Sequence, residues 1–276
     1  MLRSILIGLD GSSDCEAAVE LGLAWAKEHD ALAVGLSVVD ESGIIVSAQA
    51  SFASGYRHPI TEPLIDTARL RCRLILDQFS ERCHQHRVHG KTLNETGTPY
   101  VQLLEEAQRC DIIVLGQKTH FDYGWKDQAD ETLGRVLKDS PRPVVAVPQA
   151  AVNGQAVVVA YDGSLQASRA LYAFEASGLA RSRTVYVVSV APIHAEATRH
   201  ANRAVEFLRN HDIKAVDVAL ETHDKPGEII LNEVRRRDTG LLVMGAYGQP
   251  TLREFFIGSV TRVILDKSPV AVFCYH

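Results

Sequence analysis

Glycine and hydroxyl residues gather after one apolar run near the C-terminal end of the chain. Residues 241–244 are apolar, which predicts a buried strand, and Gly245 and Gly248 follow this strand. Gly258 and Ser259 stand directly before a second apolar-periodic run that predicts a helix. Glycine lets another group approach the backbone closely, and a helix start offers unpaired N–H groups to an anion. The pattern therefore predicts a phosphate-binding loop, with Ser259 as an additional donor.

The spacing of these glycines differs from the two widespread phosphate-binding patterns. Neither GxGxxG nor GxxxxGK[ST] occurs in the chain. A purely structural alternative is that Gly245 and Gly248 form an ordinary turn and Gly258 starts a helix. The spacing resembles the G-2x-G-9x-G-S/T signature of the ATP-binding members of the universal stress protein family.

Composition narrows the class of protein. The 276 residues suit two domains, and 46% hydrophobic with 23% charged residues is typical of a globular protein. A net charge of -5 gives no general attraction to nucleic acid or anionic membranes. The apolar runs are too short to span a bilayer and the N-terminus leads directly into a strand, which predicts a cytoplasmic protein. Five scattered cysteines without a CxxC pair predict reduced thiols rather than disulfides.

Apolar runs alternate with helical patterns along the first half. The expected strands are residues 4–9, 31–39, 90–95, 111–115 and 143–147. Helical patterns lie between them, including residues 64–87, 100–108 and 133–138. Residues 41–63 have weak periodicity and many small side chains, so we expect a long loop with one short helical turn at most.

The second half repeats the first. Asp10-Gly11-Ser12 recurs as Asp162-Gly163-Ser164, and residues 112–116 are echoed by residues 241–245. The offset is 152 residues at the aspartates (162 minus 10) and 129 at the glycines (245 minus 116). The chain is therefore an internal duplication, whose first copy carries an extra piece of about 23 residues between its second strand and second helix.

Strands that alternate with helices at this spacing predict an α/β fold with a parallel sheet covered on both faces. Right-handed crossovers then place a ligand at the carboxyl ends of the strands. Asp162, Val190 and residues 244–248 end three strands of the second copy, so we expect them to meet in one crevice.

With both copies in view, the chain resembles a tandem universal stress protein over nearly its whole length apart from residues 41–63. The resemblance implies two tandem, doubly wound, five-stranded parallel-sheet domains of the adenine-nucleotide-binding kind, at residues 1–150 and 151–276. It also implies that the halves pair like the subunits of a family dimer through their final strands, residues 144–147 and 270–273.

The same resemblance implies a site for ATP, with Mg²⁺, in the second half. Asp162 would lie beside the ribose and base, Val190 beside the adenine, and the helix start at Gly258 against the phosphates. A helix-capping role is the alternative for Asp162. The implied nucleotide-binding residues are Ala160, Tyr161, Asp162, Val190, Met244, Gly245, Gly248, Gly258, Ser259 and Val260. Tyr247 stands where many members have a basic or polar residue, although Arg253 could reach a phosphate.

The first copy departs from the family pattern. Asp130-Glu131 falls at the positions of Gly258-Ser259, and Thr119 or His120 falls at that of Gly248. Carboxylates there would repel a triphosphate, so we expect no ATP in the first half although Asp10 is retained. The alternative is that the alignment slips and Gly124 or Gly134 serves instead.

Recognisable catalytic and metal-binding patterns are missing from the sequence. It contains no GxSxG, no HExxH and no obvious base beside the glycine loop apart from Glu254. Cys83, His86 and His89 have metal-ligand spacing but lack further ligands, so a solvated helix end is expected rather than a metal site. A slow or incidental ATPase is the most that these residues predict.

The leading hypothesis is a cytoplasmic universal stress protein that holds ATP in its second half as a sensor or regulatory ligand. It has no nucleic-acid or membrane partner, its halves form an intramolecular pseudo-dimer, and association into a homodimer is left open. The extra segment at residues 41–63 would cover the vacant first crevice or contact a partner. The alternatives are an enzyme that hydrolyses ATP or transfers a phosphoryl or nucleotidyl group, and an interaction scaffold that binds no nucleotide.

Overall fold

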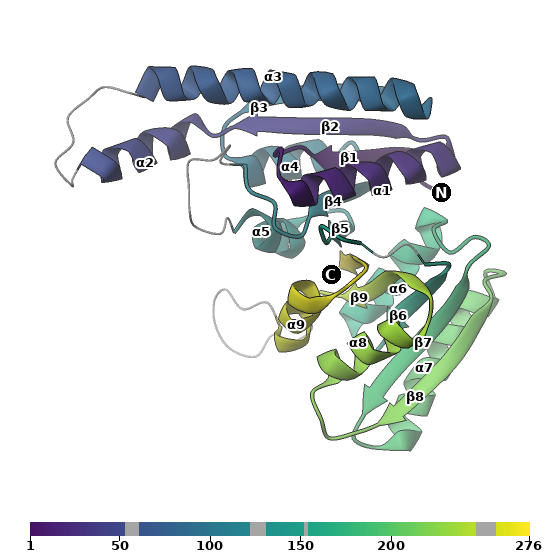
Figure 1. The fold of residues 1–276 in the computed structure, drawn as a ribbon. Helices are drawn as coiled ribbons and strands as arrows, with labels where there is room; N and C mark the ends of the chain where they lie inside the picture. The colour runs from purple at the N-terminus through teal and green to yellow at the C-terminus, as the bar shows by residue number, and fades with distance from the viewer. Residues whose placement is uncertain (53–60, 122–130, 152–153, 247–257) are drawn as a thin grey trace. The chain divides into compact units, whose positions relative to one another are not determined.

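The computed structural model describes residues 1–52, 61–121, 131–151, 154–246 and 258–276. The chain divides into two compact units, Leu2–Arg142 and Pro143–His276, with Met1 joined to the second. Each unit is a sheet flanked by helices (Figure 1), and we describe the units in turn. In the described part of the chain, no helix combines the length and apolar character that a membrane span requires.

The first unit contains a parallel sheet in the order β3-β2-β1-β4. Leu6 in the centre of this sheet lies level with Val34 on one side and Ile113 on the other. Its strands are β1 (Ser4–Gly8), β2 (Leu32–Val39), β3 (Gly90–Thr96) and β4 (Ile112–Gly116). Its helices are α1 (Ser13–His29), α2 (Glu41–Phe52), α3 (Thr61–His86), α4 (Pro99–Ala107) and α5 (Thr132–Asp139).

The second unit repeats this order as β8-β7-β6-β9 and adds two more strands, β10 and β5. The strands are β5 (Val144–Val147), β6 (Ala156–Ala160), β7 (Thr184–Ala191), β8 (Ala215–Glu221), β9 (Thr239–Gly245) and β10 (Ala271–Tyr275). The helices are α6 (Leu165–Ser177), α7 (His194–Arg209), α8 (Pro226–Arg236) and α9 (Ser259–Lys267). β5 is antiparallel to β10, with Val145 opposite Phe273. The predicted pairing of the two final strands is therefore confirmed, as is the predicted doubly wound α/β fold.

The sheets are buried by helices that pack in pairs. In the first unit α1 contacts α3 and α4 contacts α5, as right-handed crossovers require when two helices lie on each face. Gly35 in β2 allows α3 to pack closely against the sheet, because a Cβ at position 35 would lie 2.6 Å from the ring of Phe79 on α3.

Val187 holds the place of Gly35 in the second unit, since it pairs with β6 as Gly35 pairs with β1. Ala204 holds the place of Phe79, because these residues come four positions after His200 and Ile75, which contact the equivalent glycines Gly163 and Gly11. The volume of the pair is therefore redistributed between strand and helix.

The prediction of a loop at residues 41–63 was wrong, because residues 41–52 form α2. Asp40 starts this helix: its Oδ1 accepts a hydrogen bond from the Gly43 N–H at 2.8 Å, and its carbonyl accepts one from Ile44 at 3.0 Å. Ile44 then packs into a small core with Val39 and Cys72. Ile44 is the buried side chain among residues 41–46, whose burial the structure describes. α3 also begins at Thr61, before the predicted start at residue 64.

Candidate functional site

The predicted strand-end residues of the second repeat share one edge of the sheet. Ala160 at the end of β6 lies level with Met244 in β9 and with Val188 in β7. Val190 lies two residues further along β7 and is half-buried, as is Ala160, whereas Met244 is buried. The structure therefore brings these residues to the carboxyl edge, where a ligand of a doubly wound sheet binds.

Asp162 lies in the loop between β6 and α6 and is exposed. Its Oδ1 accepts a hydrogen bond from the Ser164 N–H at 3.0 Å. Ser164 is the residue that caps α6, because its Oγ accepts a hydrogen bond from the Ala167 N–H at 3.1 Å. The alternative role of Asp162 as the helix cap is thus wrong, and its carboxylate is presented to solvent at the strand ends.

Two other predicted positions have structural roles of their own. The Tyr161 hydroxyl lies 2.9 Å from the Ser168 Oγ on α6, which directs it to that helix. Gly245 permits the close approach of α6 to β9, since a Cβ there would lie 2.6 Å from the Ala167 nitrogen. The structural explanation for a glycine at position 245 is therefore sufficient without a ligand.

Gly258 differs from Gly245. It caps α9 with φ -52° and ψ 145°, a conformation open to any residue. Among the described residues, a Cβ there would approach only the Thr261 Oγ1, at 3.9 Å. Neither the backbone angles nor the packing of the described residues requires glycine at this place.

The start of α9 lies at the same edge as the strand ends. β10 is parallel to β9, so the helix between them runs back along the sheet and begins at the carboxyl edge. Its first intrahelical hydrogen bond is donated by the Arg262 N–H to the Gly258 carbonyl, at 3.0 Å. The N–H groups of Ser259 and Val260 come earlier in the helix, and Ser259 is exposed. This helix end can donate to an anion.

The middle of the predicted phosphate loop lies outside the described residues. This holds for Gly248 and for Tyr247, Arg253 and Glu254, whose roles stay predictions. Asp130 and Gly124 of the first repeat are likewise outside them.

Asp10, the counterpart of Asp162 in the first repeat, lies in a different environment. Asp10 is only 4% exposed, and its carboxylate accepts hydrogen bonds from the N–H groups of Ser12, at 2.9 Å, and His120. Burial raises the pKa of Asp10, while these backbone donors and the charge of His120 oppose the rise. The acid is thus a buried anchor for the loop after β4.

That loop is folded back against α1. Thr119, which falls at the position of Gly248, is buried, and its Oγ1 donates to the Gly116 carbonyl at 2.8 Å. The Lys118 N–H donates to the Asp14 Oδ2 at 3.0 Å. The space that a glycine would leave beside the backbone is therefore filled by a threonine.

A carboxylate stands at the start of α5, as predicted for the first repeat. Glu131 is the N-cap residue, forms no side-chain cap hydrogen bond and has a side chain that is 81% exposed. By sequence count Glu131 matches Ser259, but in the structure it takes the capping place of Gly258. Gly134, the alternative phosphate-binding glycine, lies inside α5.

The cysteine and histidine cluster at the end of α3 does not converge. The Cys83 thiol is buried beside Gly90, whereas His86 faces Glu20 on α1, with 3.8 Å between Nε2 and a carboxylate oxygen. Within the described ranges no three His, Cys, Asp or Glu side chains are grouped to hold a metal.

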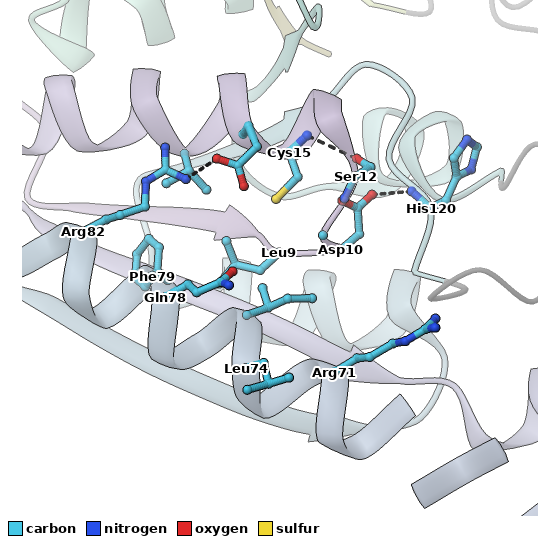
Figure 2. Close-up of a pocket in the computed structure, with 14 residues that line it drawn as sticks. Leu9, Asp10, Ser12, Cys15, Arg71, Leu74, Gln78, Phe79, Arg82 and His120 are labelled. Carbon is cyan, nitrogen blue, oxygen red and sulfur yellow. Dashed lines mark hydrogen bonds and ion pairs between the residues drawn. The ribbon is translucent and has the colours of Figure 1, made fainter. Parts of the chain in front are cut away.

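Sequence reasoning missed a cavity in the first repeat. It has a volume of about 510 Å³ and lies between α1 and α3 beside the Asp10 loop (Figure 2). The helical periodicity of α3 could have shown that Arg71, Leu74 and Gln78 share one face, but not that α1 stands away from that face.

Known proteins resemble the chain throughout its length. The model of the Universal stress protein family matches residues 1–148 and 154–276. Universal stress protein Slr1230 from Synechocystis sp. is 25% identical over 289 residues, covering 100% of both chains. A universal stress protein structure from Archaeoglobus fulgidus DSM 4304 has a TM-score of 0.73 at 18% identity, covering 99% of this chain and 97% of that one. A family protein from Arabidopsis thaliana with AMP bound has a TM-score of 0.35 at 16% identity, covering 53% of this chain and 91% of that one. The chain therefore belongs to the universal stress protein family and carries one family domain in each half.

Proposed function

We propose that the second repeat binds an adenine nucleotide, ATP with Mg²⁺, as a sensor or regulatory ligand in the cytoplasm. The site is the carboxyl edge formed by β6, β7, β9 and the start of α9. Gly258 carries this proposal, because among the described residues nothing in its backbone angles or packing explains a glycine there. Space beside an open helix start is what a phosphate group needs.

The described residues offer matching chemistry for the rest of a nucleotide. Asp162 can accept hydrogen bonds from sugar hydroxyls, and Val190 offers an apolar surface to a base. N–H groups at the start of α9 and the Ser259 hydroxyl can donate to phosphate oxygens. Mg²⁺ would neutralise the charge of those phosphates and keep several of its own waters.

The first repeat lacks this chemistry. Glu131 places a negative charge at the helix start, and at about 4 Å a like charge costs on the order of 1–4 kcal/mol near a protein surface. Asp10 is buried and engaged by Ser12 and His120, so it is withdrawn from a ligand. We therefore expect one nucleotide site per chain, in the second repeat. AMP bound to the Arabidopsis thaliana member agrees with a nucleotide site in this family.

Nucleotide content tests the proposal directly. Purified protein is denatured, and the released nucleotide is identified and counted by chromatography. We expect about one ATP per chain for the wild type and almost none for Gly258→Asp, which adds both a side chain and a charge. Gly258→Ala should retain the fold, since its Cβ meets only the Thr261 Oγ1 among the described residues, and should weaken nucleotide binding less than the charged variant does.

Glu131→Gln is the matched control in the first repeat. It removes the carboxylate at the equivalent helix start, and the nucleotide content should not change. A content that depends on position 131 but not on position 258 would show that the sites have been assigned to the wrong repeats. An empty protein at millimolar ATP would instead indicate a scaffold, and steady phosphate release that Gly258→Asp abolishes would indicate an enzyme.

A further inference from the structure

We propose that β8 is a docking surface for a second copy of this chain. β8 ends the strand order β9-β6-β7-β8, and Figure 1 shows it at the outer edge of the sheet in the second unit. Within the described residues, no strand pairs with its outer side. An edge strand of this kind offers unpaired N–H and C=O groups to another strand.

Alternate residues of β8 carry these unpaired backbone groups. The Lys214 carbonyl accepts a hydrogen bond from β7 at 2.9 Å, and the Thr222 N–H donates one to β7 at 3.0 Å. In a parallel pair every second residue bonds to the neighbouring strand, so the even-numbered residues of β8 direct their backbone groups to β7. The backbone groups of Asp217, Ala219 and Glu221 therefore point outward.

One side-chain face of β8 is apolar and partly exposed. It consists of Val216, which is 38% exposed, and of Val218 and Leu220, which are half-buried. β3, the edge strand of the first unit, has other residues at the corresponding positions, namely Lys91, Leu93 and Glu95. Charged side chains on an edge strand hinder its pairing with another chain. β3 has this protection on the equivalent face, whereas β8 does not.

Charge selects one register when two copies of β8 pair about a two-fold axis perpendicular to the sheet. Such a pair is antiparallel, and its hydrogen-bonded positions must be the odd-numbered residues. The three central registers place the axis at position 217, 218 or 219. The first sets Asp217 opposite itself and the third sets it opposite Glu221, and like charges directly opposite each other are destabilising. The axis at position 218 sets Asp217 opposite the uncharged Ala219.

The register centred on Val218 joins the apolar faces of the two copies. Val218 lies opposite Val218 of the second copy, and Val216 lies opposite Leu220. Their side chains form one stripe across the junction and are removed from water there. Asp217 and Ala219 exchange backbone hydrogen bonds across the junction, so the outward-pointing groups at both positions gain partners.

The same register brings opposite charges together at both ends of the junction. Glu221 lies opposite Ala215 of the second copy. The Ala215 carbonyl accepts a hydrogen bond from Arg209 Nη2 at 3.0 Å, which holds the guanidinium beside the strand. In the described part of the chain, neither Arg209 nor Glu221 takes part in an ion pair. Pairing of two copies therefore supplies each of them with a partner of opposite charge.

Cysteine cross-linking of the full chain tests the register. Two copies of residue 218 face each other at a non-hydrogen-bonded position, where Cα atoms lie about 4.5 Å apart, which is within disulfide range. Val218→Cys should therefore give a disulfide-linked dimer on mild oxidation. Val216→Cys is the matched control, because its two copies would lie four residues or about 13 Å apart. All native cysteines are buried, so the wild type should not cross-link.

Two substitutions at Ala219 test the charge complementarity by sedimentation velocity. We expect the wild type to dimerise with a Kd on the order of 10 μM, since one strand pair makes a small interface. Ala219→Lys places a cation opposite Asp217 of the second copy and should strengthen dimerisation about three- to tenfold, whereas Ala219→Asp should weaken it by a similar factor. Circular dichroism checks that each variant is folded.

Asn94 in β3 provides the matched control, because it lies level with Ser37 as Ala219 lies level with Ser189. Asn94→Lys and Asn94→Asp make the same changes of net charge and should dimerise like the wild type. Opposite responses at position 219 without a response at position 94 would support β8 as the interface between copies.

Three results would overturn the proposal. The first is a wild type that remains monomeric at its highest soluble concentration, which would leave β8 open to an extended segment of another protein. The second is equal cross-linking of Val216→Cys and Val218→Cys. The third is an equal response to lysine and aspartate at position 219. Either of the last two would place the contact between copies elsewhere.

Discussion

The carboxylate of Asp10 accepts a hydrogen bond from the backbone N–H of His120, which joins the end of β1 to the loop after β4. Asp162, its counterpart in the second repeat, accepts a hydrogen bond from Ser164 within its own loop. Asp10 is buried and Asp162 is exposed. The same residue type at the same strand end therefore anchors a distant loop in one repeat and is an exposed carboxylate in the other.

Alanine substitutions at these two aspartates should have opposite consequences. Asp10→Ala leaves the partly buried N–H groups of Ser12 and His120 without their acceptor and should lower the free energy of unfolding by about 1–3 kcal/mol. Asp162→Ala should cost about 0.5 kcal/mol or less, since the side chain is exposed, yet it should weaken nucleotide binding. Urea unfolding and nucleotide titration of both variants check this. Equal destabilisation would contradict the different roles.

The raised pKa of Asp10 should make the free energy of unfolding depend on pH. Burial raises its pKa above the ordinary value of 3.8, so the folded state binds the proton more tightly than the unfolded state does. The resulting stabilisation is fully present below the unfolded pKa and is lost as the pH rises through the folded pKa. We expect the stability of the wild type relative to Asp10→Asn to fall as the pH rises above 3.8. A difference that is constant or increases with pH in urea titrations would exclude this.

Substitutions at Gly35 and Phe79 should have non-additive effects on the free energy of unfolding. Gly35→Ala places a Cβ 2.6 Å from the ring and should cost about 1–3 kcal/mol through overpacking. Phe79→Ala should cost about 3–5 kcal/mol through the cavity it leaves. The double variant Gly35→Val with Phe79→Ala reproduces the Val187 and Ala204 pair of the second repeat. It should be more stable than the sum of the separate effects of Gly35→Val and Phe79→Ala indicates, and strict additivity of these two would argue against direct coupling.

The cysteines should react slowly while the protein is folded. All five are buried, and burial raises the pKa of Cys15 and of Cys274 to about 12 and that of Cys110 to about 11. At pH 8 a thiol of pKa about 12 is ionised to only about one part in 10⁴, and the thiolate is the reactive form. A thiol reagent should therefore label native protein far more slowly than protein in guanidinium. Rapid labelling of Cys15 or Cys274 in the native state would show that these thiols are accessible.

Strands and repeats could be predicted from the sequence because their signals are local. Apolar runs of residues such as 112–116 and 241–245 are buried on both faces in any parallel sheet, so their composition alone indicates their place. α2 could not be predicted in this way. Its position depends on the Asp40 cap and on the docking of Ile44 against α3, and neither produces a strong periodic pattern.

The sequence by itself determined that the chain is a duplicated α/β protein with glycine and a hydroxyl at one helix start and a carboxylate at the other. Only the tertiary structure decided that Asp10 is buried while Asp162 is exposed, because the hydrogen bond that withdraws Asp10 joins residues 110 positions apart. The cavity between α1 and α3 was likewise decided by packing, since a cavity exists only where two helices are held apart by their other contacts. Local pattern specifies which faces are buried, whereas the separation of those faces depends on contacts between distant parts of the chain.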